Sequence, residues 1–192
     1  MSVSRSRPKK KHRHKVLAPP LSQATKRANA LFTGLLVVGL VMSIFVKELY
    51  EATIMPCYVP VGIWIGAGIS SYLSVRRYMA KHNVGHIMLT RSFACFMGFG
   101  SIVVFGFMAI NYYAPGNSPT ETMDVDITGA GHKLQGRSRC ASPYVLASVR
   151  GYEKQFICDC DTRSEEYDGV RVELRKGFFG YDRIMEWWLL RK

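Results

Sequence analysis

The stretch SFACFMGFGSIVVFGFMAINYY, residues 92–113, runs for twenty-two residues without a charged side chain. A helix rises about 1.5 Å per residue, so a run of this length exceeds the roughly 30 Å hydrocarbon core of a bilayer. Two earlier runs share this property, ANALFTGLLVVGLVMSIFV at residues 28–46 and YVPVGIWIGAGISSYLSV at residues 58–75. Three such runs so close together argue against the buried helices of a soluble protein and predict three transmembrane helices.

The charges around these runs predict an orientation. Residues 1–30 hold nine Lys and Arg and no acidic residue, and residues 76–91 hold four more, again without an acid. Residues 114–192 hold twelve basic and twelve acidic residues, so they carry no surplus. Basic residues in short loops stay cytoplasmic. We therefore expect a cytoplasmic N-terminus, a first run that acts as a retained signal anchor, and an extracytoplasmic C-terminal region.

Residues 1–27 form a basic tail, which we predict to be disordered and cytoplasmic because it has almost no apolar content before Val16. Such a tail attracts anionic lipid headgroups. The side chains expected to contact them, in the tail and after the second run, are Lys9, Lys10, Lys11, Arg13, Lys15, Arg76 and Arg77. The tail has no aromatic side chain on which bases could stack, so its composition argues against nucleic-acid binding.

Small residues repeat at helical spacing on one face of the second run and on a similar face of the third. They are Gly62, Gly66, Ser70, Ser74, Ala94, Gly98 and Gly106. Small side chains let helices approach closely in lipid, so we expect these faces to pack on each other in one three-helix bundle over residues 28–113. An interface between copies of the chain is the competing use of the same face. No Asp, Glu, Lys or Arg lies inside a run, which argues against a transporter or pump.

Residues 114–192 predict a compact all-β domain. In TMDVDITG, residues 122–129, apolar and acidic residues alternate, which is typical of a half-buried strand. Residues 143–161 indicate two strands around a turn, and residues 169–192 alternate before and after a second turn. The fold class is therefore membrane α plus small all-β: three transmembrane helices, then an antiparallel sheet or barrel of five or six strands. A short helix is the alternative for the last dozen residues.

Four of the five cysteines fall on the predicted extracytoplasmic side: Cys57, Cys140, Cys158 and Cys160. An even number of cysteines in an oxidising compartment indicates disulfides. Residues one apart on a strand point to the same face, which favours separate partners for Cys158 and Cys160. We predict that Cys140 pairs with one of them and Cys57 with the other, which would tie the domain to the first membrane loop.

A metal site is the alternative use of these side chains, with His132, Cys140, Cys158 and Cys160 as ligands. A Cys-x-Cys pair suits Cu(I), but the spacing lacks the paired Cys-x-x-Cys knuckles of a zinc ribbon. A thiol oxidoreductase has less support, because its usual Cys-x-x-Cys at a helix N-terminus is absent from the sequence. We expect no cofactor.

Four aromatic residues near the C-terminus are candidates for contact with a partner or with the membrane surface: Phe178, Phe179, Trp187 and Trp188. Alternation along a strand places Trp187 and Trp188 on opposite faces, so we expect one in the core and the other exposed. The sequence contains neither a nucleophile elbow nor a phosphate-binding loop, and His132 is the one histidine in residues 114–192. We therefore predict no catalytic residues.

These patterns favour a non-enzymatic, membrane-anchored binding or assembly module. Its extracytoplasmic β domain would contact a protein or an envelope component, or a second copy of the chain. One alternative is a metal- or thiol-redox-handling membrane protein that uses Cys158 and Cys160. Another is a membrane effector or immunity protein that acts through its helices. We expect the protein in a bacterial inner membrane, although the sequence is also compatible with an organellar membrane.

Overall fold

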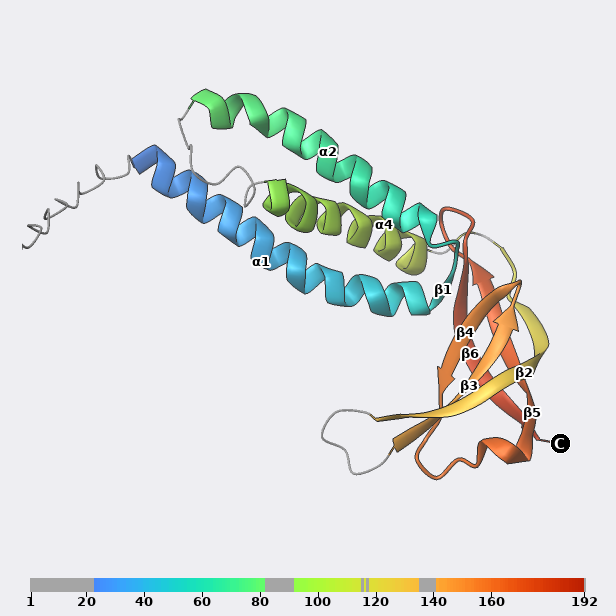
Figure 1. Cartoon of the computed structure of the whole chain (residues 1–192). Coiled ribbons are helices and arrows are strands. Elements are labelled where there is room, and N and C mark those ends of the chain that lie inside the picture. The colour runs from blue at the N-terminus through green and yellow to red at the C-terminus, as the bar shows by residue number, and fades with distance from the viewer. Residues whose placement is uncertain (1–22, 82–91, 115, 117, 135–140, 192) are drawn as a thin grey trace, which may run out of the picture.

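The computed structural model describes residues 23–81, 92–114, 116, 118–134 and 141–191. It contains a bundle of helices with a β domain at one end (Figure 1). Three helical segments are long and apolar enough to cross a membrane, as the uncharged runs predict. They are α1 (Gln23–Glu51), α2 (Tyr58–Lys81) and a third span made of the π-helix η1 (Ala94–Gly100) and α4 (Ser101–Tyr113).

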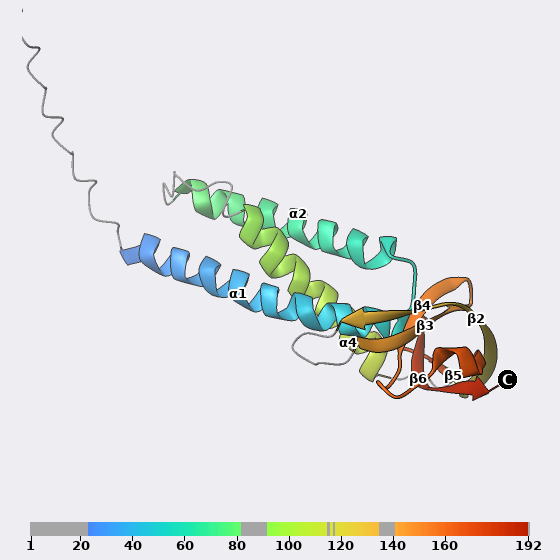
Figure 2. The ribbon, with the colours of Figure 1, turned by 60° about the horizontal axis from the view of Figure 1, so that its bottom comes forward.

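The third span is the centre of the bundle, because α1 and α2 each pack against it rather than against each other (Figures 1 and 2). Two glycines allow these close approaches. A Cβ on Gly39 of α1 would lie 2.2 Å from the carbonyl oxygen of Met97, and a Cβ on Gly68 of α2 would lie 2.4 Å from the ring of Phe96. A larger side chain at either position would force the helices apart.

The prediction that the small faces of α2 and the third span pack together is wrong. An added Cβ on Gly62 or Gly66 has no neighbour within 4 Å, and Ser70 and Ser74 are exposed. Spacing by four identifies a face of a helix but not its direction, and α2 instead turns the face with Trp64 and Gly68 inward. In the third span Ala94 and Gly98 are buried, but Gly98 packs on Leu35 of α1, and Gly106 has no such neighbour.

The β domain is a nearly closed antiparallel sheet with the strand order β1-β6-β5-β2-β3-β4. Its strands are β1 (Thr53–Ile54), β2 (Glu121–Leu134), β3 (Ala141–Val149), β4 (Tyr152–Ile157), β5 (Tyr167–Lys176) and β6 (Asp182–Arg191). A short 3₁₀-helix, η2 (Ser164–Glu166), precedes β5. The first half of β2 pairs with β5 and the second half with β3, with an irregularity between Ile127 and Gly129 where the sheet bends.

Alternating side chains of the strands fill the inside of this sheet. The fully buried ones include Val145, Val149, Val170, Val172 and Leu174. Phe156 of β4 and Trp187 of β6 meet inside, with ring centroids 5.3 Å apart. The last residues form strand β6 rather than the alternative helix. The prediction of a small antiparallel sheet after three helices is therefore confirmed.

The first strand comes from the helical half of the chain. In β1, Thr53 and Ile54 lie between α1 and α2 and pair with Arg183 and Asp182 of β6. The amide of Ile184 also donates a hydrogen bond to the carbonyl of Ala52, at 2.9 Å. The loop between the first two helices is thus a strand of the C-terminal domain.

Candidate functional site

The joint between the helices and the β domain contains a buried lysine. Lys154 of β4 is 9% exposed, and its Nζ donates hydrogen bonds to three backbone carbonyls, two at the end of α1 and one in β1. The distances to the oxygens of Thr53, Tyr50 and Glu51 are 2.6, 3.0 and 3.3 Å. The last carbonyls of a helix have no partner within the helix and carry partial negative charge, so two of the three ammonium donors satisfy those of Tyr50 and Glu51, and the third bonds to β1.

Burial lowers the pKa of Lys154, and the nearby charge of Glu51 acts in the opposite direction. The ammonium group also lies 5.0 Å from the centroid of the Tyr50 ring, which is a favourable position for a cation. Lys154 therefore joins β4, one edge strand of the sheet, to α1 and to β1, which is the other edge strand. Its side chain crosses the gap that keeps the sheet from closing.

A second basic side chain donates a hydrogen bond to a carbonyl near the end of α4. Arg183 of β6 is buried, and its Nη1 donates a hydrogen bond to the carbonyl of Tyr112 near the end of α4. The guanidinium carbon lies 5.6 Å from the centroid of the Tyr112 ring. Two of the helices that are long and apolar enough to cross a membrane thus end on basic side chains of the β domain. The sequence pattern did not identify either residue, because both contacts join positions far apart in the chain.

The turn between β5 and β6 completes the joint. The side chain of buried Asn111 in α4 accepts a hydrogen bond from the amide of Phe179, at 3.1 Å, and donates one to the carbonyl of Tyr181, at 3.4 Å. A Cβ on Gly177 would lie 2.1 Å from the carbonyl oxygen of Asn111, so the turn approaches α4 as closely as glycine permits. The ring of Phe179 stacks on Phe107 of α4, with centroids 4.5 Å apart.

The four aromatic candidates divide between the joint, the core and the surface. Phe179 belongs to the joint, and Phe178 beside it is largely exposed at the end of α4. Trp187 packs on the core, whereas Trp188 is 46% exposed on the outer face of β6. In register with Trp188 lies Arg171 of β5, whose guanidinium forms two hydrogen bonds with Asp124, at 2.7 and 2.8 Å.

The cysteines do not form the predicted bridge from the first loop. Cys57 and Cys158 have free thiols, whereas Cys160 is disulfide-bonded. Cys140 lies outside the described residues, and no disulfide joins two residues that the structure describes. The pairing argument assumed that Cys158 and Cys160 share a strand face. Strand β4 ends at Ile157, so the chain turns, and Cys158 enters the core while Cys160 is exposed.

The metal alternative gains no support from the described side chains. Within the described residues, no group of three or more His, Cys, Asp and Glu lies close enough together to hold a metal ion. His132 is exposed on β2. Burial also raises the pKa of the Cys158 thiol, with the charge of Asp159 adding to the shift. A protonated, buried thiol is a poor metal ligand and a poor nucleophile.

Two of the candidate lipid contacts, Arg76 and Arg77, are exposed near the end of α2 that lies away from the joint (Figure 1). The tail residues Lys9, Lys10, Lys11, Arg13 and Lys15 lie outside the described part of the chain.

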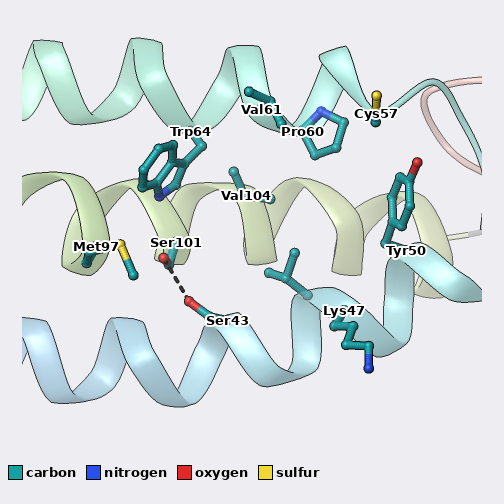
Figure 3. Close-up of a pocket in the computed structure, with 11 residues that line it drawn as sticks. Ser43, Lys47, Tyr50, Cys57, Pro60, Val61, Trp64, Met97, Ser101 and Val104 are labelled. Atoms are coloured by element: carbon teal, nitrogen blue, oxygen red, sulfur yellow. Dashed lines mark hydrogen bonds between the residues drawn. The ribbon is translucent and has the colours of Figure 1, made fainter.

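An apolar groove of about 400 Å³ lies between α1 and α2, close to the joint (Figure 3). Val46 of α1 and Val61 and Trp64 of α2 form its walls, and Val104 of the third span lies beneath them. A hydrogen bond of 3.0 Å joins the hydroxyl groups of Ser43 and Ser101 inside it. Sequence analysis did not predict this groove, because the residues that line it come from three separate helices.

No known protein family, curated protein or solved structure matches this chain. The geometry of the joint and of the groove is therefore the basis for assigning a function.

Proposed function

We propose that the protein is a non-enzymatic, membrane-anchored binding module that holds its β domain in one orientation against the bilayer. The observation that carries the proposal is the pair of buried cations at the joint. Lys154 and Arg183 satisfy carbonyls at the ends of α1 and α4, so tilting the domain would leave charged groups buried without partners. A domain that only needed a tether would require a linker, not such a joint.

The outer face of β6 is the surface that we propose to bind a protein partner. Trp188 and Met185 are exposed there, and tryptophan is a residue type enriched among those that dominate binding energy. Among the described strands, β1 pairs with Asp182 and Arg183 of this edge, and the amide of Ile184 bonds to Ala52, so we propose that the backbone beyond Ile184 is open for pairing. An extended segment of a partner would add a strand there, with its side chains reaching Trp188.

Photo-crosslinking in living cells tests this surface. A benzophenone amino acid replaces Trp188 in the full-length protein, and a matched variant carries it at His132, an exposed position on β2. We expect one discrete adduct with another protein from position 188 and none from position 132. An adduct with twice the mass of the chain would show that the partner is a second copy of the chain and not another protein. Equal or absent crosslinking at both positions would contradict the proposal.

We further propose that the N-terminus is cytoplasmic and the β domain extracytoplasmic, in a bacterial inner membrane. The support is the distribution of basic residues, nine of which lie in residues 1–30. Cys57 provides the test, because it is an exposed free thiol near the joint. A membrane-impermeant maleimide should label it in intact spheroplasts, and a Cys57→Ser variant is the control. Labelling only after the membrane is opened would reverse the orientation.

We propose that Cys140 and Cys160 form a structural disulfide. The support is that Cys160 is bonded while Cys57, Cys95 and Cys158 are free, in a chain with five cysteines. Such a bond closes a loop within a small domain, where disulfides contribute most. A thiol-redox function has less support, since reactive cysteines are exposed and have lowered pKa values, whereas Cys158 is buried and its pKa is raised.

A further inference from the structure

We propose that the groove between α1 and α2 binds one acyl chain of an anionic phospholipid, with the headgroup at Lys47. The groove does not contain Trp188 or any other part of the proposed partner surface, so this proposal stands independently of that surface.

The interior of the groove fits an apolar ligand. Its walls are aliphatic and aromatic, from Val46, Val61, Trp64 and Val104. The hydroxyl groups of Ser43 and Ser101 bond to each other, and Ser43 also lies 2.8 Å from the carbonyl oxygen of Gly39. Because these hydroxyl groups satisfy one another, they do not require a polar ligand. A hydrocarbon chain loses nothing by replacing water against such walls.

The position of the groove selects a lipid. Its walls belong to the three segments long and apolar enough to span a membrane. Because α1 and α2 pack on the third span and not on each other, the groove is a gap between two helices that would face lipid in a bilayer. A helix about 10 Å wide fills roughly this volume with a single turn, so a spanning helix of another protein is too large. A single acyl chain is narrow enough.

The mouth of the groove supplies a polar end. Lys47, Tyr50 and Cys57 lie where the groove meets the joint (Figure 3). The Nζ of Lys47 is 3.6 Å from Glu51, and both side chains are largely exposed, so this ion pair is weak enough for a phosphate to displace. An apolar cavity with a cation at one end matches an anionic amphiphile.

The third span adds an independent observation. Met97, at the groove, lies within the seven-residue π-helix η1, and Ser101 follows it directly. π-Helical turns are rare and occur frequently at functional sites, because they shift side chains relative to the regular helix. Here the π-helix lies where the groove passes between the helices, so the unusual backbone and the groove coincide.

The test reconstitutes the full-length protein in nanodiscs of equal phosphatidylglycerol and phosphatidylcholine, and native mass spectrometry counts the retained lipids. Val61→Trp fills the groove from an exposed position of α2, and Ile65→Trp places the same side chain on α2 outside the groove. We expect one retained phosphatidylglycerol for the wild type and Ile65→Trp, and a loss of about tenfold or more for Val61→Trp. Lys47→Gln should lower the preference for phosphatidylglycerol about fivefold.

A second measurement uses the wild type alone, so it stands even if Val61→Trp does not fold. Phosphatidylglycerol with a diazirine in its acyl chain should crosslink at Met97 and Val104 of the groove. Crosslinks spread evenly over exposed residues such as Ile69 and Leu73 would overturn the proposal, as would equal lipid retention by Val61→Trp and Ile65→Trp. A second copy of the chain in place of the lipid would also overturn it.

Discussion

At the scale of single residues, the unusual feature is that buried basic side chains donate hydrogen bonds to the carbonyls at the C-terminal ends of helices. Lys154 and Arg183 belong to strands of the β domain, yet their donors satisfy carbonyls at the ends of α1 and α4. Helix ends normally use a glycine turn or water for these groups. Here the same groups are covered by the docked domain, so the domain must supply donors.

Replacing Lys154 tests this account. Lys154→Met keeps the apolar stem and leaves three carbonyls without their donor, so we expect the free energy of unfolding to fall by about 3 kcal/mol. Lys176→Met is the matched control, because Lys176 is an exposed lysine at the end of β5. Denaturant titration of the full-length protein in micelles measures both. Equal losses in the two variants would remove the special role of Lys154.

The burial of Cys158 predicts how its reaction with an alkylating reagent depends on pH. Burial raises its pKa, so at a given pH it holds less of the reactive thiolate than an ordinary cysteine. At about pH 8 iodoacetamide should label exposed Cys57 and leave Cys158 unlabelled. Labelling of Cys158 should increase only as the pH rises well above the usual pKa range of a cysteine thiol. Peptide mapping follows both sites, with the denatured protein as the fully labelled control. Rapid labelling of Cys158 at about pH 8 would mean that it is not buried.

At the scale of elements, the bundle depends on which glycines meet a neighbour. Gly39 lies against the backbone of the third span, whereas Gly62 has open space around it. Both glycines are in apolar helices, and their sequence surroundings do not distinguish them. The same substitution at both positions therefore compares a glycine that packs on a neighbouring helix with one that does not.

Alanine at these two positions should change stability differently. Gly39→Ala places a Cβ 2.2 Å from a backbone oxygen, so the helices must separate, at a cost of about 1–3 kcal/mol. Gly62→Ala meets nothing and should be neutral, or stabilising by up to about 1 kcal/mol. Unfolding of each variant in mixed micelles measures the difference. A larger loss for Gly62→Ala would restore the packing face that the sequence pattern predicts.

The parts of the fold that can be predicted are those that depend on short-range patterns in the sequence. Uncharged runs predict the three helices, and alternation predicts the sheet and places Trp187 and Trp188 on opposite faces. The two-residue strand β1 has no local signature, because pairing with β6 alone makes it a strand. The contacts of Lys154 cross about a hundred residues of sequence, so they depend on the complete fold. The same holds for the groove.

At the scale of the whole molecule, the helices and the β domain form one unit. The strand β1 links α1 to α2 and belongs to the sheet, two cations join helix ends to strands, and the turn after β5 rests on α4. The sequence suggested a disulfide from Cys57 for this link, but backbone pairing and buried cations provide it instead.

An engineered disulfide between β1 and β6 tests this central claim most directly. Ile54 and Asp182 lie directly opposite each other, where antiparallel partners have Cβ atoms about 5 Å apart. In a Cys57→Ser background, Ile54→Cys with Asp182→Cys should form a bond within one chain in native membranes under mild oxidation. Ile54→Cys with Trp188→Cys, farther along β6, should not. Linked peptides from the first pair alone are the predicted result. Absence of that link, or equal linkage in both pairs, would contradict the docked arrangement.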